Sequence, residues 1–458
     1  MAKKISAEKS FKKNESSFLE LNDMLSKFSP DGAIIEDSMY AKIDEWIGTG
    51  YYILNAALSG SIFGGLPNRR SLMLAGAEGT GKTYIACSIV RNAQAMNYFP
   101  VYFDSEGSID VDFVKRLGID TTKFRIENIG TVEEFTNLSA NIIETVKKIK
   151  EEGKTPPKIM VVLDSLGSLS SLKEKADAIS GSEKRDMTKQ QAIRKTFRVL
   201  GNDFAKYGIP FIVNNHVYAA IGSFVGGDVI SGGGGGKYSP SIIFTLTKSN
   251  YGDTTDKVSE NRVKKLGLEK AKVGLTITLW PYKQRFARPI PVKIYIPFYK
   301  QPNPFVGLER FISWENCGII RGKALNEKEY LKLPESDQKK CHKFLVTPDM
   351  TDKDVKEIND EKNQPKYVYA FPKDSARTLV CKHLNGEVPI AELYTEKVFT
   401  QEVLQQLDDN VIKKTFMLPS IESLEDLNEV TDLINEVNNE DDNTKIDDND
   451  ILNDLDNI

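Results

Sequence analysis

The stretch Gly76-Ala77-Glu78-Gly79-Thr80-Gly81-Lys82-Thr83 decides the fold that we expect for this chain. It matches the pattern G-x-x-x-x-G-K-[ST] of a phosphate-binding loop. The apolar run 71–75 before it is typical of a buried parallel strand. Apolar side chains follow it at helical spacing, at Ile85, Ala86, Ile89, Val90 and Ala93. This order of strand, glycine loop and helix is the one that the motif needs, which argues against a chance match in a glycine-rich turn.

The loop predicts a site for ATP and Mg²⁺. Its glycines let backbone N–H groups point into one concavity that holds phosphate oxygens. The N-terminus of the following helix adds a partial positive charge. We expect the Lys82 ammonium to reach the β- and γ-phosphates and the Thr83 hydroxyl to bind Mg²⁺.

Length and composition indicate a globular protein of two or three units. The chain has 458 residues, of which 40% are apolar and 28% are charged. It contains no run of about 18 apolar residues, so we expect no membrane span. Residues 1–6 turn polar without the apolar stretch of a signal peptide. Only four cysteines are present, which favours reduced thiols in the cytoplasm.

The charge is distributed unevenly along the chain. Residues 421–458 hold fourteen Asp and Glu against one Lys, a net charge of −13. The whole chain carries −4, so residues 1–420 carry +9. A basic body with an acidic tail fits a polyanion-binding protein whose tail masks the basic surface, although the tail could also serve only for solubility.

Further apolar runs predict an α/β fold with a mainly parallel central sheet flanked by helices. They span residues 101–103, 159–163, 211–213, 242–246, 275–279 and 292–296. In such sheets the ligand binds at the carboxyl ends of the strands. Polar residues stand at those ends, at 76–83, 104–106, 164–165 and 214–216.

We expect four segments. Residues 1–47 hold a helix and linker that contact a neighbouring subunit, and residues 48–300 form the ATPase core. Residues 301–418 form a small α+β domain, and residues 419–458 form an acidic tail expected to be disordered. No internal repeat of fixed period is evident.

Two carboxylates stand where phosphate chemistry needs them. Asp164 follows an apolar strand, as a Walker-B acid does, and would hold Mg²⁺ opposite Thr83. The alternative is an aspartate that caps a loop. Glu106 ends the strand after the first helix and could orient the water that attacks the γ-phosphorus.

Two loops could contact nucleic acid. Residues 217–236 are rich in glycine and include Phe224, Gly232, Gly233 and Gly234, with Lys237 next. Such a loop could order against DNA and wedge an apolar side chain between bases, or it could be a flexible linker. Residues 170–188 carry Lys184 and Arg185, and a predicted helix over 190–204 carries Arg194; solvated surface charge is the alternative there.

A zinc site is a weak alternative. Cys341, His342, Cys381 and His383 could supply four ligands, but neither pair has the ordinary spacing of a zinc knuckle.

The chain resembles the RecA-type strand-exchange recombinases, and among them the phage members. The matching pieces lie at 49–60, 76–83, 103–106, 117–120, 163–169, 186–188, 215–216 and 237–239. The resemblance covers about residues 45–300. It implies a RecA-like core, a DNA-dependent ATPase, and a cytoplasmic location, in the host cell if the chain is encoded by a phage.

The resemblance also implies roles for single residues. Glu106 matches the catalytic carboxylate, and His216 matches the residue that couples the γ-phosphate to the second DNA-binding loop. Asp110 and Phe113 match positions that contact adenine. Residues 170–188 and 217–236 match the two DNA-binding loops, although the second has little positive charge. Lys283 and Arg285 resemble the pair that reaches the ATP of the adjacent subunit.

The sequence therefore predicts an ATP-dependent recombinase that forms helical filaments on single-stranded DNA and exchanges strands with duplex DNA. Single-strand-binding and mediator proteins would be further partners. A RecA-fold ring helicase is the first alternative, which the short N-terminal segment disfavours. A non-catalytic ATP-binding clamp is the second, which Glu106, Asp164 and Lys82 disfavour.

Overall fold

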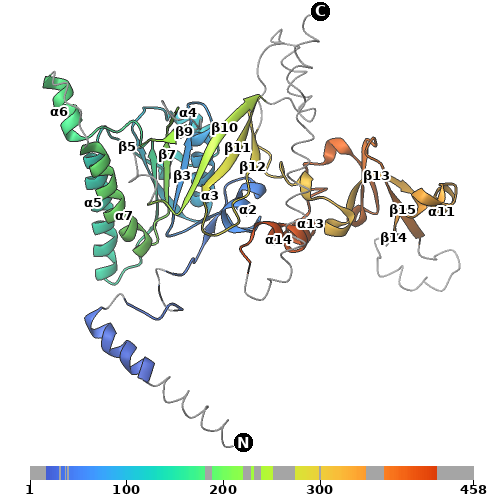
Figure 1. Cartoon of the computed structure of the whole chain (residues 1–458), viewed down its shortest axis with the longest axis horizontal. Helices are drawn as coiled ribbons and strands as arrows, with labels where there is room; N and C mark the ends of the chain where they lie inside the picture. Colours follow the sequence, from blue (N-terminus) through green and yellow to red (C-terminus); the bar gives the residue numbers. More distant parts are fainter. Residues whose placement is uncertain are drawn as a thin grey trace, which may run out of the picture.

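The structure is a computed structural model of the chain. It describes residues 17–29, 32–36, 38, 41–180, 188–219, 228–231, 239–250, 274–298, 301–346 and 366–419. Residues 17–28 form a helix that lies apart from the body (Figure 1), within the segment 1–47 that was expected to hold a helix and linker. Its apolar residues are exposed, among them Phe18 at 68% and Phe28 at 86%.

Eight strands form the central sheet. They are β3 (Ser71–Gly76), β4 (Tyr98–Asp104), β5 (Arg125–Asn128), β6 (Lys158–Asp164), β7 (Phe211–Asn215), β10 (Ile242–Asn250), β11 (Gly274–Lys283) and β12 (Val292–Pro297). Their order is β12-β11-β10-β3-β7-β6-β4-β5. The six strands from β10 to β5 are parallel, and β11 and β12 are added antiparallel at one edge. The predicted α/β class with a mainly parallel sheet is confirmed.

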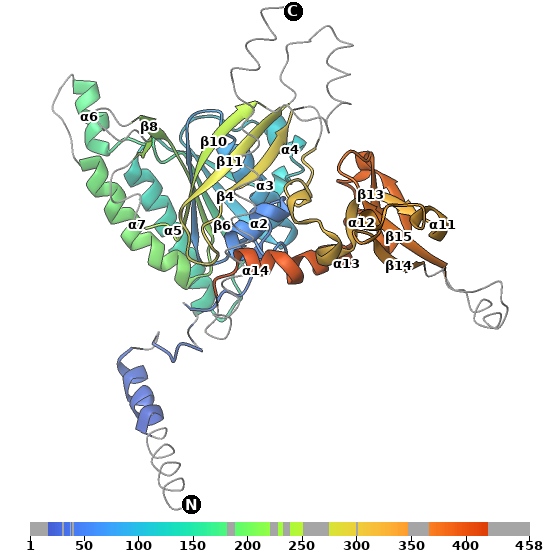
Figure 2. The same cartoon turned by 45° about the vertical axis from the view of Figure 1, so that its right-hand side comes forward.

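Helices cover both faces of this sheet (Figures 1 and 2). They are α2 (Tyr52–Ser59), α3 (Lys82–Ala95), α4 (Val111–Arg116), η1 (Thr121–Lys123), α5 (Val132–Glu151) and α7 (Thr188–Lys206). Helix α6 (Leu172–Ser180) buries none of its residues and projects away from the sheet. Two short ladders join β1 (Trp46–Ile47) to β2 (Leu66–Pro67) and β8 (Val217–Ala219) to β9 (Asp228–Ile230). A capping box formed by Thr131 and Glu134 starts α5.

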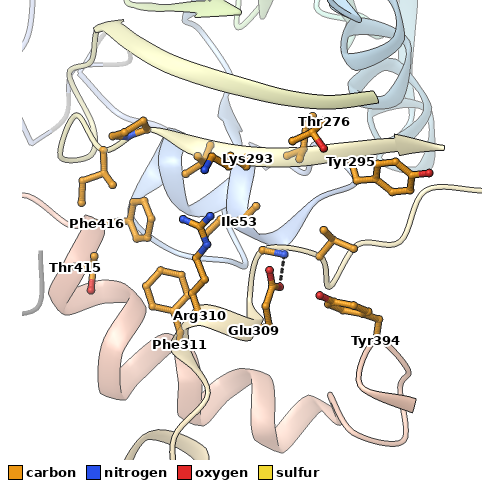
Figure 3. A pocket seen from close by; sticks show the side chains of 16 residues that line it. Ile53, Thr276, Lys293, Tyr295, Glu309, Arg310, Phe311, Tyr394, Thr415 and Phe416 are labelled. Carbon is orange, nitrogen blue, oxygen red and sulfur yellow. Dashed lines mark hydrogen bonds between the residues drawn. The ribbon is translucent and has the colours of Figure 1, made fainter. Parts of the chain in front are cut away.

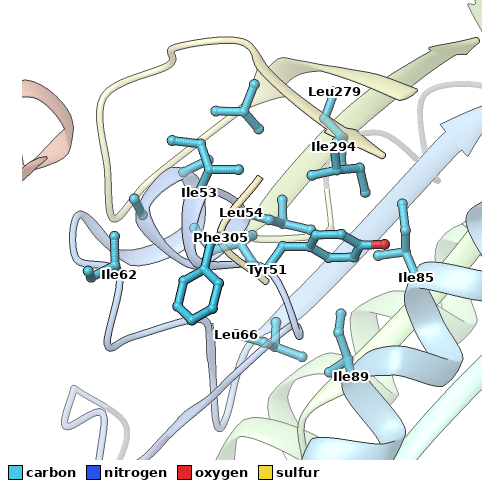
Figure 4. Close-up of a cluster of buried hydrophobic side chains, with 14 of the residues drawn as sticks. Tyr51, Ile53, Leu54, Ile62, Leu66, Ile85, Ile89, Leu279, Ile294 and Phe305 are labelled. Carbon is cyan, nitrogen blue, oxygen red and sulfur yellow. The ribbon is translucent and has the colours of Figure 1, made fainter. Parts of the chain in front are cut away.

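Side-chain alternation along the strands divides the core in two. On β3, Leu72 and Leu74 join the cluster under α2 and α3 (Figure 4), whereas Met73 and Ala75 join the cluster under α5 and α7. In the second cluster Phe211 contacts three rings at centroid distances between 5.2 and 5.8 Å, those of Phe135, Phe197 and Phe204. Both faces are buried, which is why the strands are almost wholly apolar.

The chain after residue 300 forms a second sheet. Its antiparallel strands are β13 (Ile319–Leu325), β14 (His342–Val346), β15 (Lys366–Pro372), β16 (Thr378–Cys381) and β17 (Gly386–Pro389), in the order β14-β15-β13-β16-β17. Short helical turns surround it: η3 (Glu309–Phe311), α10 (Trp314–Cys317), α11 (Glu327–Tyr330), α12 (Glu335–Gln338), η6 (Lys382–Leu384) and η7 (Ile390–Glu392). The domain boundary expected near residue 300 stays a prediction.

The last helical segment packs back onto the core (Figure 2). It consists of α13 (Gln401–Leu407), the π-helical turn η8 (Asp408–Ile412) and α14 (Lys413–Phe416). The buried Asp408 carboxylate accepts hydrogen bonds from the Ser61 hydroxyl at 2.8 Å and the Ile62 backbone N–H at 2.9 Å. A cavity of about 180 Å³ lies where this segment, η3 and β12 meet (Figure 3).

No helix in the described parts of the chain is long and apolar enough to cross a membrane.

Candidate active site

The phosphate loop connects β3 to α3, as the sequence predicts. Gly79 and Gly81 have φ angles of 69° and 80°, in the left-handed region that favours glycine. A Cβ atom on Gly81 would lie 2.6 Å from the Cδ1 atom of Ile296. The Lys82 ammonium donates to the carbonyl oxygens of Gly76 at 2.8 Å and Ala77 at 2.9 Å. Burial lowers the pKa of Lys82, and Asp164 and Glu106 oppose this shift through their charge.

Thr83 and Asp164 lie together, as expected for a magnesium site. The Thr83 hydroxyl donates to Oδ2 of Asp164 at 2.6 Å, and the Tyr102 hydroxyl donates to the same oxygen at 2.6 Å. Burial raises the pKa of Asp164, and these two donors oppose the shift. Because the Thr83 O–H group is the donor in its hydrogen bond to Asp164, the lone pairs of the Thr83 oxygen stay free for a cation. Hydroxyl and carboxylate oxygens are the ligands that Mg²⁺ prefers, so these residues fit the ion.

Glu106 lies two residues after β4 and accepts three hydrogen bonds on one oxygen. The donors are the Ser165 hydroxyl, the Ser168 hydroxyl at 3.0 Å and Nε2 of His216 at 2.7 Å. Burial raises the pKa of Glu106, but the three donors outweigh it, so the pKa lies below its ordinary value. Glu106 is therefore ionised at neutral pH, and an ionised carboxylate only accepts, so the proton sits on Nε2 of His216.

These residues line one cavity of about 930 Å³ at the carboxyl edge of the sheet. Its wall includes residues of the loop, Glu106, Asp164, His216 and Phe113. Phe113 is thus placed where an adenine could contact it. Asp110 is not among the described residues that line the cavity, and its carboxylate caps α4 by accepting from the Phe113 backbone N–H at 2.8 Å. The adenine contact expected of Asp110 stays a prediction.

Several residues of the site were not predicted. Tyr84, Arg116, Phe298 and Gln301 also line the cavity, and Tyr102 lies behind it. Tyr102 belongs to an apolar run and looks like a core residue until β4 and β6 pair. The only sequence signal for Arg116 was its place three residues after Phe113 on a short helix.

Lys283 and Arg285 lie far from the phosphate loop of their own chain. Arg285 lines a cavity of about 520 Å³ beside Ser71 and Phe211, the first residues of β3 and β7. The phosphate loop begins at the other end of β3, roughly 17–20 Å away for a strand of this length. Burial and repulsion from Arg285 lower the pKa of Lys283.

The same cavity gathers five arginines, and we call it the arginine cavity. They come from the residues just before β3, from α7 and from the turn after β11: Arg69, Arg70, Arg194, Arg198 and Arg285. Burial, with repulsion from Arg69 and Arg285, lowers the pKa of Arg70. Arg69 pairs with the Asp44 carboxylate at 2.7 Å, but no acidic side chain is among the described lining residues, so the other four arginines suit the cavity to an anion. Arg194, which the sequence predicted to bind DNA, and Arg285, which it predicted to bind ATP, thus line the same cavity.

The loops predicted to bind DNA are only partly described. Lys184, Arg185, Phe224, Gly232, Gly233, Gly234 and Lys237 lie outside the described residues. The prediction that 170–188 is a loop throughout was wrong, because α6 forms over Leu172–Ser180. Its apolar residues Leu172, Ala176 and Ile179 stand at helical spacing, but none of the residues of α6 is buried.

The zinc alternative finds no support. Cys341 and His342 lie at β14, whereas Cys381 and His383 lie at β16 and η6, and two strands separate β14 from β16. The His342 ring stacks on Trp314 at 5.2 Å instead. Within the described residues no three His, Cys, Asp or Glu side chains are grouped as metal ligands.

Comparison with known proteins identifies the family of the chain. The model of the RecA N-terminal domain family matches residues 21–280 of the 458. The recombination and repair protein of Enterobacteria phage T4, UvsX, is 29% identical over 208 residues, which are 44% of this chain and 50% of that protein. Protein RecA of Mycobacterium sp. strain KMS is 29% identical over 225 residues, 48% of this chain and 59% of that protein.

Protein RecA of Mycobacterium tuberculosis strain H37Rv is 31% identical over 192 residues, 41% of this chain and 22% of that protein. The chain spans about half the length of the first of the curated relatives that it matches. The family match covers more than half of the chain and includes the phosphate loop, Glu106, Asp164 and His216, so the chain belongs to the RecA family.

Proposed function

We propose that this protein is an ATP-dependent DNA recombinase. It would form helical filaments on single-stranded DNA, pair them with homologous duplex and exchange strands in recombination, repair and recombination-dependent replication. The observation that carries the proposal is the hydrogen bond between His216 and Glu106. It joins a catalytic carboxylate to the residue that precedes a loop expected to bind DNA.

The site contains the groups that ATP hydrolysis needs. Lys82 would turn from the loop carbonyls to the β- and γ-phosphates, and Thr83 and Asp164 would hold Mg²⁺. The ion, when bound, would supply charge neutralisation of the phosphates. Glu106 is ionised and would accept a proton from the attacking water or orient it.

The base of the second loop is tied to the site by three hydrogen bonds. The Ser231 backbone N–H donates to the His216 carbonyl at 2.9 Å, and the Asn215 side-chain amide donates to the Ser231 carbonyl at 2.9 Å. His216 in turn donates to Glu106. Movement of the loop on DNA would therefore move His216 and release one donor from Glu106. We propose that this release couples DNA binding to hydrolysis.

The arginine cavity supports assembly. Its cations lie at the amino edge of the sheet, where they serve no phosphate of their own chain. In a filament Lys283 and Arg285 would reach the ATP of the adjacent subunit, and Arg194 would contact DNA phosphates. Single-strand-binding and mediator proteins would act as partners, in the cytoplasm, which is that of the host if the gene belongs to a phage.

The proposal is tested by ATPase assays with and without single-stranded DNA, combined with electron microscopy of the DNA complexes. We expect DNA to stimulate hydrolysis and helical filaments to form. A His216→Ala variant should keep nucleotide binding and lose most of the stimulation. Closed hexameric rings, or hydrolysis that does not respond to DNA, would contradict the proposal.

A further inference from the structure

Asn214 carries a buried side-chain amide that the chemistry above does not use. The residue lies on β7, is 0% exposed, and neither its Nδ2 nor its Oδ1 has a hydrogen-bond partner in the described part of the chain. The next residue differs, because the Asn215 amide both donates to Ser231 and accepts from the His216 backbone N–H. A buried polar group without a partner destabilises the folded state.

Strand geometry places this amide on the side of the metal residues. Ile212, two residues earlier on β7, packs in the cluster beneath α3, and side chains two positions apart share a face. Val162 on β6 belongs to the same cluster, so Asp164 shares that face too. The pairing of Leu163 with Val213 brings Asp164 and Asn214 to neighbouring positions.

A backbone contact also joins Asn214 to the segment of Asp164. The Leu166 backbone N–H donates to the Asn214 carbonyl at 2.9 Å, which fixes the chain just after Asp164. The buried amide and the buried Asp164 carboxylate thus occupy neighbouring positions on one face of the sheet.

We propose that Asn214 is a positioning residue for the metal–nucleotide site, with its side-chain N–H turning to the Asp164 carboxylate when Mg²⁺ and ATP are bound. The inference rests on the proposed use of Mg²⁺·ATP. In that state the carboxylate must stay ionised and aimed at the ion, and a third donor beside Thr83 and Tyr102 holds it there. Such outer partners of metal ligands affect metal affinity through orientation.

The test compares Asn214→Leu with Ser139→Ala in the full chain. Ser139 is a matched control because its hydroxyl is also buried without a partner in the described residues, on α5 and under the opposite face of the sheet. A fluorescent ATP analogue is titrated with Mg²⁺, and its affinity is also measured in EDTA. Chemical unfolding is followed without nucleotide or metal.

We expect Asn214→Leu to raise the half-saturating Mg²⁺ concentration roughly tenfold or more while affinity in EDTA stays the same. Unfolding of the metal-free variant should need as much denaturant as wild type or more, since the partnerless amide is gone. Ser139→Ala should leave the Mg²⁺ midpoint unchanged.

An unchanged Mg²⁺ midpoint in Asn214→Leu would overturn the inference. Equal losses of affinity with and without Mg²⁺, together with easier unfolding, would also overturn it and make Asn214 a structural residue. If wild-type protein bound no nucleotide under any condition, the proposed function itself would fail, which is a distinct result.

Discussion

Nε2 of His216 lies 2.7 Å from Oε1 of Glu106, so the end of β7 is hydrogen-bonded to the carboxylate that follows β4. The strand β6 lies between these two strands in the sheet. Ser165, just after β6, also donates to the same oxygen. Three strand ends therefore converge on one oxygen atom, and a shift at any of them changes the surroundings of the group proposed to orient water.

Glu106→Gln should separate binding from hydrolysis. The amide keeps the size of the side chain but cannot accept the proton of the attacking water, so kcat should fall about a hundredfold or more. Affinity for ATP should stay near that of wild type. Steady-state hydrolysis and equilibrium nucleotide binding measure the two effects.

Lys82→Ala is the contrasting variant, because it removes the ammonium that neutralises phosphate charge and should abolish hydrolysis.

The control for Glu106→Gln is Glu127→Gln, which changes a carboxylate on β5 that pairs with Arg125. Wild-type turnover in Glu106→Gln would remove Glu106 from the catalytic group.

Ser168→Ala should alter the acid limb of the pH profile. The hydroxyl is one of three donors that hold the pKa of Glu106 below its ordinary value of 4.5, so its loss should raise that pKa. Only the ionised carboxylate can accept a proton from the attacking water, and the ionised form is lost as pH falls through the pKa of Glu106. The variant should therefore lose kcat/KM at a higher pH than wild type, with little change at pH 7.

The matched control is Ser180→Ala, whose hydroxyl donates only to the Asp177 carbonyl on α6 among the contacts described. Rates measured at closely spaced pH values down to pH 4 should separate the two variants. Superimposable acid limbs in all three proteins would mean that the Ser168 bond does not tune Glu106.

Sequence alone predicted the part of the site that lies on short continuous motifs. The loop 76–83, Glu106 and Asp164 follow apolar strands, so their position at the carboxyl edge followed from the parallel sheet. Asn214 and Arg70 were beyond reach, because their importance comes from neighbours on other strands. Helix α6 was missed because the charged stretch 170–188 was interpreted as a loop, and the packing of Asp408 on Ser61 joins residues 347 positions apart.

A Lys283→Ala, Arg285→Ala double variant should bind nucleotide yet lose DNA-stimulated ATPase and stable filaments. Its own phosphate loop is intact, and the lost cations serve the next subunit in the proposed filament. Mixing this variant with Lys82→Ala protein should restore part of the turnover. Some interfaces would then join an intact phosphate loop to intact cations.

ATPase rates across mixing ratios measure this recovery, with co-assembly checked by sedimentation on DNA. In the control mixture both proteins carry Lys82→Ala. No interface then contains an intact phosphate loop, so this mixture should stay inactive at every ratio. If co-assembled mixtures of the two different variants also remained inactive, Lys283 and Arg285 would not act in trans.

Deletion of residues 421–458 should tighten binding to single-stranded DNA. The deletion removes a net charge of −13 from a body of +9, and the tail competes with DNA for basic surface in this account. The gain should be largest at low salt. Fluorescence anisotropy across a salt titration measures it, and equal affinities at every salt concentration would make the tail passive toward DNA.

Strand exchange between circular single-stranded DNA and homologous linear duplex tests the central claim most directly. Wild-type protein with ATP and Mg²⁺ should convert the substrates to nicked circular product, and Lys82→Ala protein should not. Heterologous duplex should give no product. Robust DNA-stimulated ATPase without any strand exchange, under conditions where filaments are seen, would contradict the account of this protein as a recombinase.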